Sequence, residues 1–158
     1  MECGLMNKID FKKEIRFECQ GSAKCCVSRD SYGYVYLSDN DIIRFSKYFK
    51  LSIKKFKDIY CQITDGLIHL IEKTDLKGNC IFLKDKKCSV YKGRPSQCRT
   101  WPFWNENMNS KVWNEDISKN CPGVGKGKVV TVKKIEEFLK EDFYNEKAIF
   151  NKRTNPSK

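Results

Sequence analysis

Apolar residues follow strand-like and helix-like spacing along most of the chain, and this pattern predicts both kinds of element. Runs rich in β-branched and aromatic residues predict short strands over residues 34–37, 66–71 and 80–83, with the last two paired as a hairpin. Apolar residues three and four positions apart predict helices after the N-caps Ser38, Ser52 and Thr131. The fold class expected from this pattern is α+β, a small single domain of short antiparallel strands and several helices.

Each predicted helix has one apolar face, which we expect to pack inward. The inward residues are Ile42, Ile43, Phe45 and Phe49, then Ile53, Phe56, Ile59 and Tyr60, and finally Val132, Ile135, Phe138, Leu139 and Phe143. We expect the last helix to end near Phe150. A shorter helix should begin at Pro95 and end before Pro102, because proline suits the first turn of a helix and not its interior. Residues 84–87 and 123–128 are expected to form turns.

The chain has no internal repeat and no linker rich in Pro, Gly or Ser, so its 158 residues are expected to form one domain. We divide it into an irregular lead-in over residues 1–16, a domain over residues 17–150 and a polar tail over residues 151–158. No stretch approaches the roughly 18 uninterrupted apolar residues of a membrane helix. Residues 1–10 lack the apolar segment of a signal peptide. The expected location is therefore the cytoplasm, without membrane attachment.

Nine cysteines are the most unusual feature of the composition. In a reducing cytoplasm, and with an odd count, they favour metal binding over disulfide bonds. Two of them stand apart. Cys3 is expected to be a free thiol, and Cys61 is either a small buried apolar residue or an additional ligand. The other seven are the candidate metal ligands: Cys19, Cys25, Cys26, Cys80, Cys88, Cys98 and Cys121.

Seven or eight thiols suffice for one four-cysteine site with spare cysteines, for two such sites, or for an iron–sulfur cluster. The adjacent Cys25 and Cys26 point in different directions in most backbones, so either one binds while the other packs or each serves a separate metal. Thiolates bind the metal, and Lys24, Arg94 and Arg99 would stabilise them. Surface salt bridges are the alternative role of the two arginines. We expect an apolar wall close to the thiols, formed by Trp101, Phe103, Trp104 and Trp113.

The formal net charge is +11, and the sequence pI is about 9.2. Lysines supply most of this excess and are scattered, with the densest run at residues 54–57. Scattered charge favours a solvated basic surface over a nucleic-acid-binding one. The glycine-rich residues 123–128 do not satisfy the Walker pattern, because Val129 follows Lys128. His69 is the only histidine and is assigned a structural role, and with no catalytic constellation evident the sequence leaves open whether the protein is an enzyme.

Six short motifs follow one another along the chain: Cys19…Cys25-Cys26, Cys80-Ile-Phe-Leu, Cys88-Ser-Val-Tyr, Arg94-Pro95-x-x-Cys98-Arg99, Pro102-Phe103-Trp104 and Cys121-Pro122-Gly123. This ordered combination, over roughly residues 17–125, resembles the YkgJ-type cysteine-cluster family. The resemblance implies a CxxCxxCC-like zinc- or iron-chelating domain, in places called an iron–sulfur oxidoreductase, and a similar domain accompanies flagellin lysine N-methylation proteins.

The first cysteine segment departs from the family pattern. Many members read Cys-x-x-Cys-Gly-x-Cys-Cys there, whereas Ser22 and Ala23 in this chain stand in place of one cysteine and its glycine. Cys61 is the candidate to compensate for the missing ligand. The overall prediction is a metal-binding protein of unknown physiological role, with zinc, iron or an iron–sulfur cluster as cofactor. The alternative is an iron–sulfur accessory to a redox or protein-modification enzyme, and a protein partner of unknown identity is compatible with both.

Overall fold

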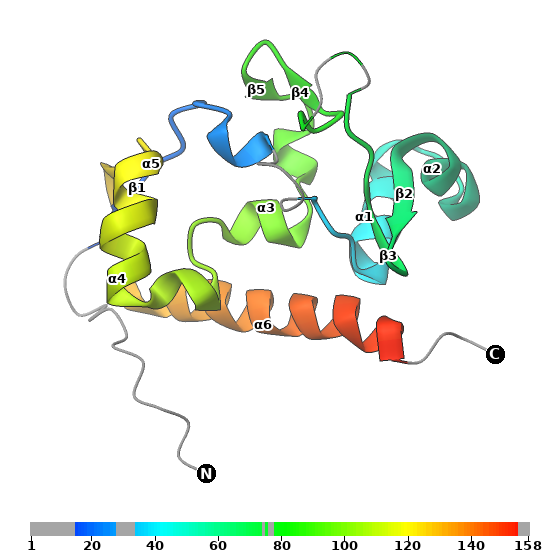
Figure 1. The fold of residues 1–158 in the computed structure, drawn as a ribbon. Helices are drawn as coiled ribbons and strands as arrows, with labels where there is room; N and C mark the ends of the chain where they lie inside the picture. Colours follow the sequence, from blue (N-terminus) through cyan, green and yellow to red (C-terminus); the bar gives the residue numbers. More distant parts are fainter. Residues whose placement is uncertain (1–14, 28–33, 74, 76–77, 155–158) are drawn as a thin grey trace.

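Short antiparallel strand pairs and several helices make up the fold, and one long helix runs along the bottom of the view in Figure 1. The computed structural model describes residues 15–27, 34–73, 75 and 78–154. Cys3 and the rest of the predicted lead-in up to residue 14 lie outside the described residues. The expected α+β class is confirmed.

Two capped helices, α1 (Asp39–Tyr48) and α2 (Ile53–Tyr60), begin where the sequence predicts. The Ser38 hydroxyl accepts a hydrogen bond from the Asp41 N–H, and the Asp41 carboxylate accepts one from the Ser38 N–H, which completes a capping box. Ser52 caps α2 by accepting a hydrogen bond from an N–H of its first turn. The local cap signals therefore place both helix starts correctly.

The apolar faces of these helices are narrower than predicted. Phe45 and Phe56 are fully buried, and their rings stack with centroids 5.3 Å apart. By contrast, Ile43, Ile53 and Ile59 are 39%, 45% and 43% exposed, so their predicted inward orientation is wrong. Ile53 and Ile59 each lie three residues from Phe56, on opposite flanks of the stripe that it buries. The short helix α2 lies at the edge of the molecule and therefore buries only that narrow stripe.

The strand predicted over residues 66–71 is present as β3 (Leu67–Leu70), and it pairs in a regular hairpin with β2 (Cys61–Thr64). The turn Asp65-Gly66 joins the two strands, and its residues have positive φ angles of 52° and 78°. Such Asp-Gly turns match the twist of a tight hairpin. Beyond β3 the predicted pairing is present in part, because Glu72 and Cys80 form an isolated antiparallel bridge and the Ile81 N–H donates a 3.2 Å hydrogen bond to the Ile71 carbonyl oxygen. The regular hairpin forms with β2, because this local turn closes it at less entropic cost than a longer loop would.

A second hairpin joins β4 (Leu83–Lys84) to β5 (Lys87–Cys88). Its tip residues, Asp85 and Lys86, have positive φ angles of 48° and 61°. Two successive residues in this conformation make the turn that two-residue hairpins favour. The polar turn predicted at this point is confirmed, and it sets the start of the segment that carries Cys88.

Residues 34–37, predicted as a strand, run along the other edge of β3 without forming a regular one. Two backbone hydrogen bonds, of 3.0 and 2.9 Å, and an isolated bridge to His69 hold them there. The His69 ring is buried, with Nε2 2.9 Å from the Thr64 hydroxyl and Nδ1 2.8 Å from the Leu70 carbonyl oxygen. It also stacks on Tyr34 at a centroid distance of 4.0 Å. These contacts agree with the structural role assigned to it.

Strands β1 (Ile15–Phe17) and β6 (Val124–Val130) pair antiparallel, although they are far apart in the sequence. β6 takes the place of the turn predicted over residues 123–128, and β1 begins inside the predicted irregular lead-in. Gly125 and Gly127 have φ angles of 80° and 70° within β6, and the pairing register shifts along β1. The glycines therefore distort a strand and do not form an open loop, because the β-branched residues after them pair with β1.

Short helices follow one another between residues 91 and 120. They are η2 (Tyr91–Gly93), α3 (Ser96–Thr100), η3 (Asn105–Met108), α4 (Ser110–Val112), η4 (Trp113–Ile117) and α5 (Ser118–Asn120). Of these, α3 is the helix that the sequence predicts, because it begins after Pro95 and ends before Pro102.

The long helix α6 (Val132–Thr154) begins after Thr131, whose hydroxyl accepts a 3.2 Å hydrogen bond from an N–H of the first turn. The predicted cap is therefore confirmed. The helix continues past Phe150, so its predicted end is wrong. Val132 and Phe143, predicted to face inward, are 41% and 53% exposed.

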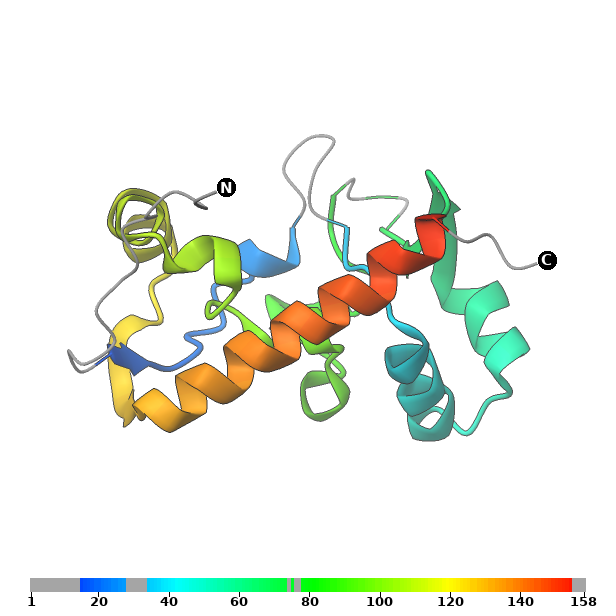
Figure 2. The ribbon, with the colours of Figure 1, turned by 90° about the horizontal axis from the view of Figure 1, so that it is seen from below.

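Two apolar clusters form the core, and α6 runs diagonally across the molecule to reach both sides (Figure 2). The first cluster contains Val35, Leu37, Ile42, Phe45, Phe56, Leu70, Phe82 and Val90. The second contains Ile15, Phe103, Met108, Trp113, Ile117 and Ile135. Within the part of the chain that the structure describes, no helix is both long and apolar enough to cross a membrane.

Candidate metal centre

Four chain segments bring cysteines to the edge of the first apolar cluster. They are η1 (Lys24–Cys26), the residue Cys80, strand β5 with Cys88 and helix α3 with Cys98. The Cys80 N–H donates a 2.9 Å hydrogen bond to the Cys26 carbonyl oxygen, and the adjacent residues form an isolated antiparallel bridge. These backbone contacts hold the N-terminal cysteines beside the segment that leads into the β4–β5 hairpin.

The thiols of Cys25 and Cys26 lie side by side, with their Sγ atoms 4.0 Å apart. Ala23, at a φ of 59°, turns the chain immediately before the tight turn of η1. The expectation that the two side chains diverge is therefore wrong. The hydrogen bond with Cys26, followed by burial and by the charge of Cys26, raises the pKa of the Cys25 thiol.

The thiol of Cys98 lies within electrostatic reach of three other cysteines. Burial raises its pKa, and the charges of Cys80, Cys25 and Cys88 raise it further. Burial also raises the pKa of Cys88, with contributions from Cys25 and Cys19. It raises the pKa of Cys80 as well, with a contribution from Cys88. Because like charges shift pKa values only at short range, five of the seven candidate ligands share one region, and Cys26 joins them through Cys25.

One cation faces much of this group. The charge of Arg94 opposes the raised pKa values of Cys25, Cys88 and Cys98. Its guanidinium stacks on Tyr91, with Cζ 3.8 Å from the ring centroid, and Nε donates a 3.0 Å hydrogen bond to the Tyr91 carbonyl oxygen. The predicted role in stabilising thiolates therefore fits Arg94.

Cys121 packs against the second apolar cluster, whereas Cys80, Cys88 and Cys98 pack against the first. Its segment is tied to that of Cys19, because the Glu18 N–H donates a 3.1 Å hydrogen bond to the carbonyl oxygen of Gly123. Cys19 is exposed, and its charge reaches Cys88. Cys19 therefore connects the segment of Cys121 with the other cysteines.

The predicted aromatic wall belongs mainly to the second cluster and is not close to most of the thiols. Phe103 and Trp113 are buried there with centroids 5.9 Å apart, and Trp101 packs against them. Trp104 differs, because its Nε1 donates hydrogen bonds of 3.0 and 3.1 Å to the backbone and a hydroxyl of α3. The wall therefore supports α3 and Cys121 and does not enclose the whole cysteine group.

Cys61 lies apart from the group. It is the first residue of β2 and packs against the first apolar cluster. Burial raises the pKa of its thiol to about 11, and the charge that opposes this rise is that of Lys57. No cysteine contributes to the shift. This environment is that of a small, buried apolar side chain.

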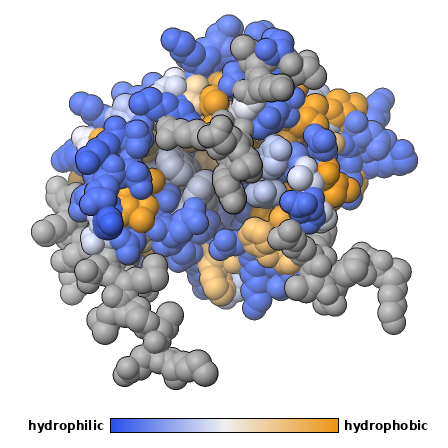
Figure 3. Space-filling view, viewed as in Figure 1, coloured by the Kyte–Doolittle hydropathy of each residue, from blue (hydrophilic) through white to orange (hydrophobic). Residues whose placement is uncertain are grey.

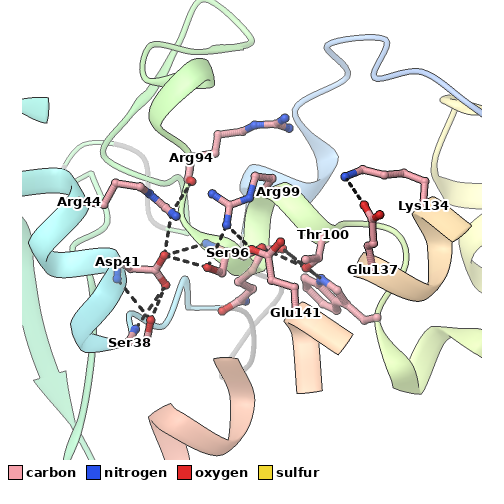
Figure 4. A network of polar contacts seen from close by, with 12 residues as sticks. Ser38, Asp41, Arg44, Arg94, Ser96, Arg99, Thr100, Lys134, Glu137 and Glu141 are labelled. Carbon is pink, nitrogen blue, oxygen red and sulfur yellow. Dashed lines mark hydrogen bonds and ion pairs between the residues drawn. The ribbon is translucent and has the colours of Figure 1, made fainter. Parts of the chain in front are cut away.

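A buried carboxylate positions the helix that carries Cys98 (Figure 4). Asp41 is fully buried, and its Oδ1 accepts hydrogen bonds from the Ser96 N–H at 2.9 Å, the Ser96 hydroxyl at 3.0 Å and Arg44 Nη2 at 2.7 Å. Arg44 Nη2 also donates to the Arg94 carbonyl oxygen at 2.8 Å. The capping box gives Asp41 a role in α1, but no sequence signal links it to Ser96.

Other side chains fix α3 on both sides. Gln97 Oε1 accepts a 3.0 Å hydrogen bond from the Tyr36 N–H, and its Nε2 donates to the Tyr34 carbonyl oxygen at 3.2 Å. Arg99 forms an ion pair with Glu141 of α6. Arg99 therefore has the salt-bridge role that was the alternative to stabilising thiolates.

The cysteines share one region but do not form a finished coordination sphere. Over residues 15–27, 34–73, 75 and 78–154, no three His, Cys, Asp or Glu side chains are gathered closely enough to hold a metal ion as they stand. Protein metal sites are rarely complete before the ion binds. Binding would therefore require the segments that carry the thiols to close further.

Comparison with known proteins places this arrangement among metal-chelating sequences. Residues 18–122 match a family described as "Putative zinc- or iron-chelating domain". A similar sequence is an uncharacterised protein of Methanocaldococcus jannaschii, 29% identical over an alignment of 125 residues, and the match covers 73% of this chain. The chain spans 63% of the length of that relative. No solved structure matches the chain.

Proposed function

Because the chain belongs to the CxxCxxCC family of zinc- or iron-chelating domains, we propose that it binds such an ion through the cysteine group around Cys98. The observation that carries the proposal is the convergence of Cys25, Cys80, Cys88 and Cys98 from four separate segments. Thiols gathered in this way repel one another when they ionise. A bound Zn²⁺ or Fe²⁺ stabilises the thiolates and removes that cost.

Cys25 and Cys26 are the pair best placed to bind one ion together. With Zn–S bonds of about 2.3 Å, two thiolates on a tetrahedral zinc lie about 3.8 Å apart. The 4.0 Å between these Sγ atoms is close to that value. We propose Cys88 and Cys98 as their partners. Cys19, Cys80 and Cys121 complete the ligand pool, for a second ion or for an iron–sulfur cluster.

The role of the cysteine group depends on whether it holds a zinc ion or an iron–sulfur cluster. Zinc held by four thiolates would stabilise the fold, since site formation and folding share one free energy. An iron–sulfur cluster would instead transfer electrons, alone or as an accessory to a redox or protein-modification enzyme. Cys19 and Cys25 are exposed, which would allow a partner to approach such a cluster.

Metal and acid-labile sulfide analysis of anaerobically purified protein, with an absorption spectrum, tests the proposal. Zinc without sulfide in a colourless solution would support the structural role. Iron with sulfide and visible charge-transfer absorption would support the cluster. Protein that holds neither metal after supply of both in the reduced state would refute the proposal.

Replacement of single cysteines tests the ligand assignment. We expect Cys98→Ser to lose most of the bound metal and to lower the melting temperature, because the Cys98 thiol lies within electrostatic reach of Cys80, Cys25 and Cys88. Cys61→Ser is the matched control, since Cys61 is also partly buried at the first apolar cluster. It should retain the metal. Equal metal content in the two variants would remove Cys98 from the ligand set.

A further inference from the structure

The β4–β5 hairpin and the turn after it carry a concentrated positive charge. Residues 84–94 contain four lysines and Arg94 but only one acidic residue, Asp85, which gives a net charge of +4 out of +11 for the whole chain. Lys84, Lys86, Lys87 and Lys92 are all exposed. Figure 3 shows hydrophilic side chains over the hairpin at the top of the molecule. We call residues 84–94 the basic surface.

The lysines of the basic surface have no ion-pair partner among the residues that the structure describes. In the denser run of α2, by contrast, Lys54 pairs with Asp58 at 2.8 Å. Charge that is not compensated within the molecule is available for an anionic partner.

The basic surface also borders the cysteine group. Cys88 lies within it, and Arg94 Nη1 donates a 3.5 Å hydrogen bond to the Cys98 carbonyl oxygen. A Cβ added to Gly21 would lie 3.9 Å from the Lys86 carbonyl oxygen, so the loop between Cys19 and Cys25 passes the hairpin tip. A partner seated on the hairpin would therefore stand next to the exposed cysteines.

We propose that the basic surface docks an acidic protein beside the cysteine group. The charge of this surface and its position support the docking itself. Only the further step, in which the docked partner contacts a bound metal, rests on the proposed function. An acidic protein fits better than nucleic acid, because Asp85 at the tip would face a continuous row of phosphates. Arg94 already occupies one face of the Tyr91 ring, which leaves the basic surface a single half-covered ring and no row of aromatic side chains on which successive bases could stack.

A membrane surface fits less well than a protein. Leu83, the apolar residue at the base of the hairpin, and Val90 are buried, so Tyr91 alone offers the basic surface a large exposed ring, which is little apolar area to insert between lipids. Its two-residue tip presents the lysines on a fixed turn. Such a rigid array suits a partner with acidic side chains in matching positions.

Charge reversal tests this surface. The patch variant carries Lys84→Glu, Lys86→Glu and Lys92→Glu. The control variant carries Lys55→Glu, Lys111→Glu and Lys147→Glu, at exposed positions on other elements. Both variants change the net charge equally. Binding to a fluorescein-labelled peptide of 20 residues, mostly glutamate, and to a labelled 20-nucleotide oligo-dT is measured by anisotropy at low salt.

We expect the patch variant to bind the glutamate peptide about tenfold more weakly than the natural chain, and the control variant less than about threefold more weakly. Equal losses in the two variants, or no binding by the natural chain, would overturn the proposal. The proposal would also be overturned if the natural chain bound oligo-dT more tightly than the glutamate peptide and only the patch variant lost that binding. If the patch variant unfolds, the matching Lys→Gln triple replaces it. Metal content is measured in parallel, so that failure of the metal proposal is seen separately.

Discussion

At the residue scale, the Asp41 carboxylate connects two helices through one buried charge. Its oxygens accept hydrogen bonds from Ser38, Ser96 and Arg44. Asp41→Asn would turn one acceptor into an N–H₂ donor that faces other donors and would leave Arg44 without its counter-charge. We expect it to lower the free energy of unfolding by about 2–3 kcal/mol. It should also weaken metal binding, because Ser96 begins the helix of Cys98. Urea denaturation and metal titration measure the two effects.

The control for Asp41 is Asp58, which pairs with Lys54 on the outer side of α2. Exposed pairs of this kind contribute little, because water and salt screen them. Asp58→Asn should leave the urea midpoint and the metal affinity unchanged. If Asp41→Asn behaves in the same way, the buried network does not hold α3 in place.

At the element scale, the pairing of β1 with β6 depends on a close approach of two backbones. A Cβ added at Gly123 would lie 2.6 Å from the Glu18 carbonyl oxygen, and a backbone atom cannot rotate away. We therefore expect Gly123→Ala to lower stability by about 1–3 kcal/mol and to speed amide exchange in β1 and β6. In the control Gly93→Ala, the added methyl meets the ring of Tyr48, which is 49% exposed and free to move. A larger loss for Gly93→Ala would contradict this explanation.

The elements that the sequence predicts well are those with local signals. Ser38, Ser52 and Thr131 mark helix starts because a cap involves residues within one turn. The pairing of β1 with β6 has no such signal, since its partners meet only after the intervening chain has folded. The hydrogen bonds between Asp41 and Ser96 are hidden for the same reason. The Asp65-Gly66 turn is also a local signal, and it accounts for the β2–β3 hairpin.

The candidate site shows the same division. Seven cysteines could be selected from composition and from their order in the chain. Their grouping could not, because it depends on where β5, α3 and η1 meet. The 4.0 Å between Cys25 and Cys26 occurs in the tight turn of η1, which begins after a left-handed Ala23, and alanine gives no sign of that conformation in the sequence. The separation of Cys61 and Cys121 from the centre of the group likewise depends on the two apolar clusters.

At the scale of the whole molecule, the candidate ligands divide between the two apolar clusters. Cys80, Cys88 and Cys98 pack against the first cluster, and Cys121 packs against the second. The ion pair of Arg99 with Glu141 and the length of α6 connect the same two halves. An ion bound by Cys121 together with the cysteines at the first apolar cluster would therefore couple the stabilities of the two clusters. An ion held only by the cysteines at the first cluster would directly stabilise that half of the molecule alone.

Metal removal distinguishes these two arrangements. At an ion concentration about a thousand times the dissociation constant, binding adds about 4 kcal/mol, so a chelator should lower the melting temperature of the metal-loaded protein by about 10 °C. Cys98→Ser should show no such shift. Hydrogen exchange then locates the effect: protection lost around both Phe45 and Phe103 indicates that Cys121 is a ligand, and loss around Phe45 alone indicates that it is not. An unchanged melting temperature would mean that the fold does not depend on the metal. Transfer of the metal or of electrons to a partner would then remain as the reason for binding it.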